Sequence, residues 1–318
     1  MPSLLTHYFF ANDCLKEARN QVIERYPSVF ALGSQGPDPM FFSSLIPFMA
    51  FSIKAIKGRY GSKLHRLDGK ELFFESLKTI EDIEDLLSKE VFMSFIFGQL
   101  AHYTLDSICH PYVYYFTGFD KNSKLSGKLH YAHSHFEGRI DSAMASNFNR
   151  KDLISKPSDV LKIKEEYLDI INSYFNATLE RIFKTSLPKN YYKSGVKNMI
   201  RVYNFVNDNE FFGSHLGKNT LGQLFIPRHD DGKVLNEDHH LWKNPFSGVV
   251  SKESFVQLYS KALKRFSIGE SMLSTLDFNK VKNYFTGINY SGVLVGQKMK
   301  YYDENGVLLD HKVYVKKK

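Results

Sequence analysis

The sequence is poor in the features that mark a secreted or membrane-embedded protein. It holds only two cysteines, Cys14 and Cys109, so no disulfide framework is indicated. The first residues lack a basic segment followed by an apolar one, and we expect no secretory signal and a cytoplasmic location. The most apolar stretch, residues 40–56, is interrupted by Pro47 and Lys54, which argues against a membrane span. We interpret it as a buried helix, with a lipid-contacting lid as the alternative.

Neither low-complexity sequence nor an internal repeat is visible. The 318 residues are 43% hydrophobic and 15% aromatic, which excludes a disordered chain and suffices for a sizeable core. The net charge of +8 favours an anionic substrate or contact with an acidic membrane surface, although it also fits plain solubility.

Helical patterns dominate the chain up to about residue 285. Pro27 should end the first helix and Pro111 the longest one, because the residue before a proline avoids the helical region. Ser251 or Ser254 is the expected N-cap of the last helix. We expect loops at 31–39 and 58–69, and helices at 4–25, 40–56, 71–87, 90–110, 130–148, 158–183, 191–205 and 254–276.

The end of the chain has a different pattern. Asn305-Gly306 lies between two β-prone runs, residues 298–303 and 308–315, which is the signal of a β-hairpin. The sequence therefore predicts an all-α multi-helix bundle over residues 1–285 and a small β-appendage over residues 286–318.

Histidine is concentrated in one part of the chain. Five of the twelve histidines fall within residues 102–135, where an even distribution would place about one. Imidazoles grouped with carboxylates are the usual ligands of zinc. The segment is therefore a candidate metal site.

The spacing of these residues is more informative than their number. His102, Asp106 and His110 follow one another at intervals of four, so a helix places all three on one face. His133 and Glu137 repeat this interval. His102 and His110 are separated by about 12 Å of helical rise, at about 1.5 Å per residue. One ion cannot reach both, so we expect His102 and Asp106 to serve one metal and His110 another.

Other polar residues of the region admit plainer interpretations. His135 faces away from His133 on a helix, and neither His130 nor His135 is expected to be a ligand. Cys109 is expected to be a buried, inert thiol. Asp141, one turn beyond Glu137, is either a residue that supports the metal ligands or a solvated charge near Arg139.

The ordered set of motifs resembles the zinc-dependent phospholipase C family, which includes secreted bacterial phospholipases C and the catalytic domain of glycosylphosphatidylinositol-specific phospholipase D. The resemblance covers roughly the first 145 residues. It is carried by Thr6-His7-Tyr8, by Gly36-Pro37-Asp38-Pro39, by His65, by HYTLD from His102 to Asp106, by His110, and by HSHFE from His133 to Glu137.

The resemblance implies an α-helical bundle with two or three zinc ions. It assigns the first zinc to Asp38, His65, His102 and Asp106, the second to His110, His133 and Glu137, and a contribution to a third to His7, with Asp106 bridging. It also implies that a metal-bound hydroxide attacks a phosphodiester, and that Asp38 orients or deprotonates the attacking water.

Two positions depart from the secreted members. Those enzymes complete their third site with the processed N-terminal residue, whereas His7 lies six residues from Met1 without a processing signal, so occupancy of the third site stays open. His110 follows Asp106 by four residues, as in the glycosylphosphatidylinositol-specific branch.

Three functions are thus compatible with the sequence. The first is a zinc-dependent phosphodiester hydrolase acting on phospholipid headgroups, in peripheral contact with a membrane surface. The second is a zinc nuclease or nucleotidase of the same fold, with nucleic acid as its partner. The third is a helical protein with a non-catalytic metal site.

Overall fold

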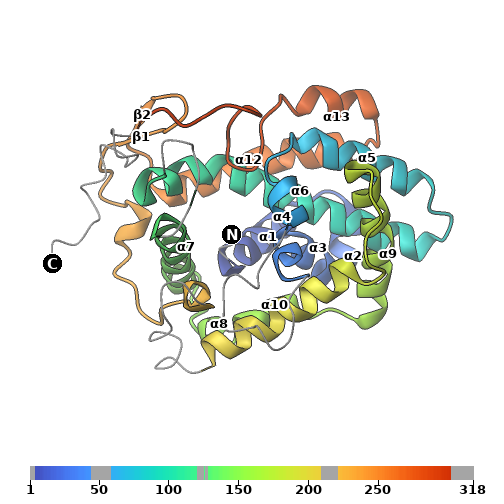
Figure 1. Cartoon of the computed structure of the whole chain (residues 1–318), viewed down its shortest axis with the longest axis horizontal. Coiled ribbons are helices and arrows are strands. Elements are labelled where there is room, and N and C mark those ends of the chain that lie inside the picture. Colours follow the sequence, from blue (N-terminus) through green and yellow to red (C-terminus); the bar gives the residue numbers. More distant parts are fainter. Residues whose placement is uncertain (1–3, 44–58, 120–124, 126–127, 209–220, 302–318) are drawn as a thin grey trace.

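A long central helix organises the fold, and most other helices pack around it (Figure 1). The structure is a computed structural model that describes residues 4–43, 59–119, 125, 128–208 and 221–301. The α-helices are α1 (Leu4–Glu17), α2 (Gln21–Arg25), α3 (Pro27–Gly33), α4 (Arg59–Leu64), α5 (Gly69–Glu81), α6 (Leu86–Thr117), α7 (Lys128–Asn147), α8 (Asp152–Ser155), α9 (Glu165–Phe183), α10 (Tyr191–Asn207), α12 (Phe255–Leu273) and α13 (Phe278–Tyr284). Short 3-10 helices are η1 (Asp38–Phe42), η4 (Pro157–Leu161), η5 (Leu221–Leu224) and η6 (Lys233–Leu235).

Helix α6 forms the core together with α3 and α12, while α1, α5, α7 and α9 pack on its other sides. Helices α3 and α6 approach so closely that a Cβ on Gly33 would collide with the backbone of Phe95, and one on Gly98 with that of Phe30. Glycine at this crossing lets the segment after α3 lie directly on α6. The prediction of an all-α bundle is confirmed.

The predicted first helix, residues 4–25, is divided in two, so that prediction was wrong. The backbone N–H groups of Arg19 and Asn20 both donate to Glu270 Oε1 at 2.8 Å instead of continuing α1. The side chain of Asn20 then caps α2 by accepting from Val22 N. The break depends on a carboxylate 250 positions away along the chain, which a local pattern does not reveal.

The expectation that Pro111 ends the longest helix was also wrong, because α6 continues through it to Thr117. The turn after Pro111 is held by aromatic packing: Tyr112 lies 5.4 Å from Trp242, and Phe116 lies 5.8 Å from Phe136, between ring centroids. The backbone oxygen of Ser107, which would accept from residue 111 in a regular helix, lies against Gly292. Tertiary contacts thus outweigh the helix-breaking tendency of proline here.

The remaining predicted elements are placed as follows. Helices α7, α10 and α12 agree with the predictions within three residues, and Ser254 caps α12 in a capping box. The segment 58–69 contains the short helix α4 rather than only a loop, and the segment 158–183 is divided into η4 and α9. Most of the predicted helix 40–56 lies outside the described residues.

The described sheet is small and precedes the predicted appendage in the sequence. Strands β1 (Trp242–Lys243) and β2 (Val250–Ser251) pair antiparallel. An isolated antiparallel bridge joins Ile288 to Leu294, within the predicted appendage. The predicted hairpin around Asn305-Gly306 lies outside the described residues, so the domain boundary at residue 285 stays a prediction. None of the described helices combines the length and hydropathy of a membrane span.

Candidate metal centre

The face of α6 predicted from the spacing exists and is buried. His102, Asp106 and His110 are each less than 9% exposed, although all three are polar. Asp106 Oδ2 lies 3.1 Å from His102 Nε2 and 3.5 Å from His110 Nδ1. The carboxylate of Asp106 therefore stands between the two imidazoles.

Helix α7 places the second predicted pair, His133 and Glu137, against His110 of α6. Glu137 Oε1 lies 3.2 Å from His133 Nε2 and 3.5 Å from His110 Nε2. The rings of His110 and His133 are stacked at 5.7 Å between centroids. These three side chains from two helices point into one common space.

Three further residues arrive from separate parts of the chain. His7 on α1 places Nε2 at 3.2 Å from Asp106 Oδ1. Asp38, the first residue of η1, has one oxygen 3.2 Å from Nε2 of His65, which directly follows α4. His65 Nε2 also lies 4.0 Å from Asp106 Oδ2. All eight residues predicted as ligands are thus neighbours, and Asp106 contacts four of the others.

Among the described residues, three groups have donor atoms close enough together to hold a cation. They are His7, His102 and Asp106; Asp38, His65 and His102; and His110, His133 and Glu137, with the atoms of each group within 4.8 Å of one another. His102 belongs to two groups, so the first two sites are adjacent. His102 and His110 thus fall into different groups, in agreement with the expectation from helical rise that they serve different ions.

Backbone carbonyls orient three of the imidazoles. The Nδ1 atoms of His65, His102 and His110 lie 2.8, 3.0 and 2.8 Å from the carbonyl oxygens of Gly61, Ser34 and Tyr290, respectively. A carbonyl only accepts, so each Nδ1 carries a proton, which leaves Nε2 as the atom that can bind a metal when the ring is otherwise neutral. These acceptors were not predicted, because any residue type supplies a backbone carbonyl.

The turn before Asp38 depends on glycine. Gly36 has φ +59°, and a Cβ there would collide with the ring of His102. Gln99 Nε2 donates to the backbone oxygens of Gly33 and Gly36, each at 3.1 Å. The turn that precedes Asp38 is therefore held against α6, next to His102.

Asp141 supports the cluster from the next turn of α7. It is 1% exposed and accepts the backbone N–H groups of Leu5 and Thr6 at 3.0 and 2.7 Å. The hydroxyl of Thr6 also donates to it at 2.7 Å. Of the two interpretations of Asp141, the structure supports the one in which it holds the segment that carries His7.

The charges of the cluster stabilise one another. Burial alone would raise the pKa of Asp106, but His110 and His102 outweigh it and hold that pKa well below its usual range. Burial opposes protonation of His110, yet Asp106 and Glu137 raise its pKa to about 9. Burial lowers the pKa of His102, which favours its neutral, metal-binding form.

Several buried polar atoms of the cluster have no hydrogen-bond partner within the described part of the chain. They are His7 Nδ1, Asp38 Oδ1, His65 Nε2, His102 Nε2 and Glu137 Oε2. Leaving such atoms unpaired is unfavourable, and a divalent cation bound to imidazole nitrogens and carboxylate oxygens would satisfy those that face the cluster. The donor set is the one that zinc prefers.

The other residues considered from the sequence are placed elsewhere. His130 Nδ1 lies 2.8 Å from Gln223 Oε1, and His135 stacks on Tyr131. Burial raises the pKa of the Cys109 thiol well above its usual value. Among the described residues, none of His130, His135 and Cys109 belongs to a group that could hold a metal.

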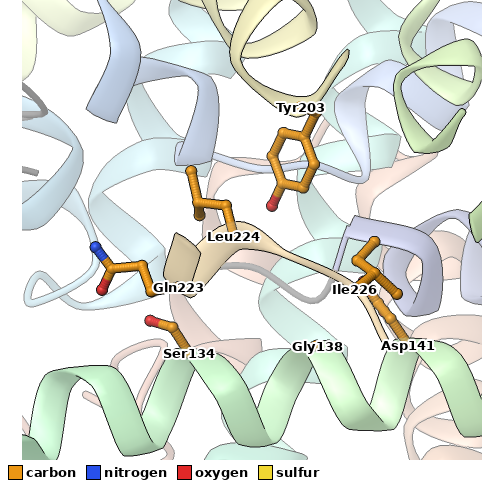
Figure 2. A pocket seen from close by; sticks show the side chains of 7 residues that line it. All are labelled: Ser134, Gly138, Asp141, Tyr203, Gln223, Leu224 and Ile226. Atoms are coloured by element: carbon orange, nitrogen blue, oxygen red, sulfur yellow. The ribbon is translucent and has the colours of Figure 1, made fainter. Parts of the chain in front are cut away.

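A small pocket lies beside α7 (Figure 2). Its lining comes from α7, α10 and the segment around η5: Ser134, Gly138, Asp141, Tyr203, Gln223, Leu224 and Ile226. Ser134 Oγ and Gln223 Nε2 are buried without a hydrogen-bond partner among the described residues, so the pocket suits ordered water. The enclosed space is enough for about one water molecule, so we do not assign the substrate to it.

Comparison with known proteins gave one match. The family model described as zinc dependent phospholipase C matches residues 6–192, more than half of the chain. The matched segment includes all eight residues of the cluster. No curated protein and no solved structure gave a significant match.

Proposed function

Because the chain belongs to the zinc-dependent phospholipase C family, we propose that it is a zinc-dependent phosphodiester hydrolase acting on phospholipid headgroups. The observation that carries the proposal is the joining of three ligand groups through His102 and Asp106. A cluster of adjacent sites can engage both the attacking and the leaving oxygen of a phosphodiester, which a single closed structural site does not.

We propose two or three zinc ions, with ligands Asp38, His65, His102 and Asp106 for the first and His110, His133 and Glu137 for the second. His7 and Asp106 would contribute to a third. Zinc, when bound, supplies a Lewis acid that lowers the pKa of water and neutralises phosphoryl oxygens.

Asp38 is the proposed catalytic residue. Its side chain is 1% exposed and fixed beside His65, while Oδ1 has no hydrogen-bond partner among the described residues. Burial opposes ionisation of Asp38, but His65 and His102 lower its pKa below the usual value, so the carboxylate is charged at neutral pH. In the proposed reaction it holds the attacking water and accepts its proton as the new oxygen–phosphorus bond forms. The bond from phosphorus to the leaving ester oxygen breaks, and that oxygen takes up a proton and departs as an alcohol.

The net charge of +8 supports an anionic substrate and peripheral contact with an acidic membrane surface. Both cysteines are free thiols, as expected for the reducing cytoplasm that we propose as its location. Hydrolysis of nucleic acid by the same site is the alternative, to be separated by experiment.

The test begins with the metal content of the purified chain. We expect two or more zinc ions per chain. The zinc content should fall in His102→Ala, because that imidazole belongs to two ligand groups, and it should be unchanged in the control variant His135→Ala. Zinc-loaded protein is then given phosphatidylcholine, phosphatidylinositol, single-stranded DNA and bis-nitrophenyl phosphate. Phospholipid turnover supports the proposal, DNA turnover selects the nuclease alternative, and zinc binding without any turnover contradicts both.

A further inference from the structure

A loop from near the end of the described chain covers the metal centre. We call residues 287–295 the site loop; it lies outside the segment that matches the family model. It is closed by hydrogen bonds from Val295 N to Gly287 O and from Asn289 N to Val293 O, both at 2.9 Å. The hydroxyl of Tyr103 on α6 donates to Ile288 O at 2.9 Å and attaches the loop to the central helix.

Tyr290 is the residue of this loop that touches the cluster with both backbone and side chain. Its carbonyl accepts from His110 Nδ1 at 2.8 Å. Its ring lies 5.1 Å from that of His65 and 5.7 Å from that of His102, between centroids. Tyr290 therefore borders the first and second proposed zinc sites at once.

The hydroxyl of Tyr290 has no role in holding the described fold. The residue is 1% exposed, and its hydroxyl has no hydrogen-bond partner among the described residues. A buried hydroxyl without a partner is destabilising, and phenylalanine would fill the same space without that cost. Such a group is expected to acquire a partner when the site is in use.

This hydroxyl can donate a hydrogen bond at neutral pH, because a phenol has an ordinary pKa of about 10.

We propose that the hydroxyl of Tyr290 donates a hydrogen bond to an oxygen of the phosphoryl group bound at the metal centre. Tyr290 is then a substrate-binding residue that the site loop adds to the ligand set. The inference rests on the proposed function, because it takes a phosphate ester as the occupant of the site.

The test compares Tyr290→Phe with the wild-type chain after zinc loading. Titration calorimetry with inorganic phosphate should show binding weakened about tenfold or more, as expected for the loss of a hydrogen bond to a charged group. The kcat/KM for bis-nitrophenyl phosphate should fall by a similar factor. Zinc content should be unchanged, and the melting temperature unchanged or raised.

Tyr259→Phe is the control. Tyr259 is also buried, but its ring packs against Phe10 and Phe148, and its hydroxyl donates to Asp13 at 2.9 Å. Its phosphate affinity and kcat/KM should stay within twofold of wild type. The proposal is overturned if Tyr290→Phe binds phosphate like wild type, or if it loses zinc. A wild-type chain that binds phosphate without hydrolysing any phosphodiester contradicts the proposed function, while the binding comparison still decides the role of Tyr290.

Discussion

Asp141 on α7 accepts hydrogen bonds from both the backbone N–H and the hydroxyl of Thr6 on α1. The N–H groups in the first turn of a helix have no partner within that helix. Here their acceptor comes from a different helix, one that also carries His133 and Glu137. Because His7 follows Thr6 directly, the contact between Asp141 and Thr6 determines where the imidazole of His7 lies.

Replacing Asp141 with asparagine should weaken both the fold and the site at His7. The amide cannot accept at both positions, so a buried N–H group loses its partner, at a cost of about 1–3 kcal/mol in the free energy of unfolding. Urea unfolding measures this loss, and zinc analysis should show weaker retention of one ion. Asp152→Asn, which removes only an exposed pair with Arg150, is the control and should resemble wild type in both measurements. Equal stability of Asp141→Asn and wild type would refute the role given to this carboxylate.

Gly36→Ala should lower both the zinc content and the melting temperature of the protein. Gly36 and Gly232 both have positive φ, +59° and +74°, but only at Gly36 would a Cβ meet the ring of His102, since nothing lies within 4 Å of a Cβ at Gly232. Gly232→Ala therefore reports backbone strain alone, on the order of 1 kcal/mol. We expect Gly36→Ala to melt at a lower temperature than Gly232→Ala and to hold less zinc. Identical behaviour of the two variants would show that His102 moves aside freely.

Removing the metal should destabilise the protein reversibly. A ligand present at about a hundred times its dissociation constant stabilises the folded state by about 2.7 kcal/mol. We expect a chelator to lower the melting temperature by at least about 5 °C, and added zinc to restore it. The experiment includes magnesium as a control, because a set of imidazoles suits zinc and not magnesium. Recovery with magnesium alone would contradict the proposed ligand set.

Zinc binding should release a proton from His110. In the metal-free protein its pKa is about 9, raised by Asp106 and Glu137 against the effect of burial, so it is protonated at pH 7.5. Protonated His110 stabilises the metal-free fold fully below about pH 6.5, the ordinary pKa of histidine. That contribution disappears as the pH rises through about 9. Calorimetric zinc titrations in buffers of different ionisation enthalpy count the protons released.

The matched variant for this measurement is His110→Gln, which cannot carry the proton. It should release about one proton fewer than wild type at pH 7.5. Equal proton release from the two chains would mean that His110 is already neutral before zinc arrives.

The parts of the site that depend on helical periodicity could be predicted from the sequence. His102, Asp106 and His110 share a face of α6 because the interval of four residues is a local property of the helix. His7, Asp38 and His65 lack such an interval, and they were identified only through the family resemblance. The structure brings all of them together, whereas their individual roles as ligands stay predictions.

The features that could not be predicted depend on distant parts of the chain. Glu270 ends α1, and the packing of Tyr112 on Trp242 carries α6 past Pro111. Tyr290 was missed because its contribution to His110 is a backbone carbonyl, and because it lies about 150 residues beyond the other site residues. The only feature of the site loop that the sequence shows is its content of aromatic residues and glycine. That composition does not distinguish a loop that lines a metal site from any other turn.

The long central helix has a consequence for how the protein assembles. The backbone hydrogen bonds of α6 are local, but the partners of His102, Asp106 and His110 come from α1, η1, α7 and the site loop, at separations of up to 180 positions, as between His110 and Tyr290. Contacts of such high sequence separation are slow to form, because closing the long intervening loop costs entropy. Tight retention of the ions would then appear only when the whole architecture has closed. The kinetics of zinc uptake by refolding chains, followed with a coloured chelator, would thus report the last step of folding rather than the formation of helices.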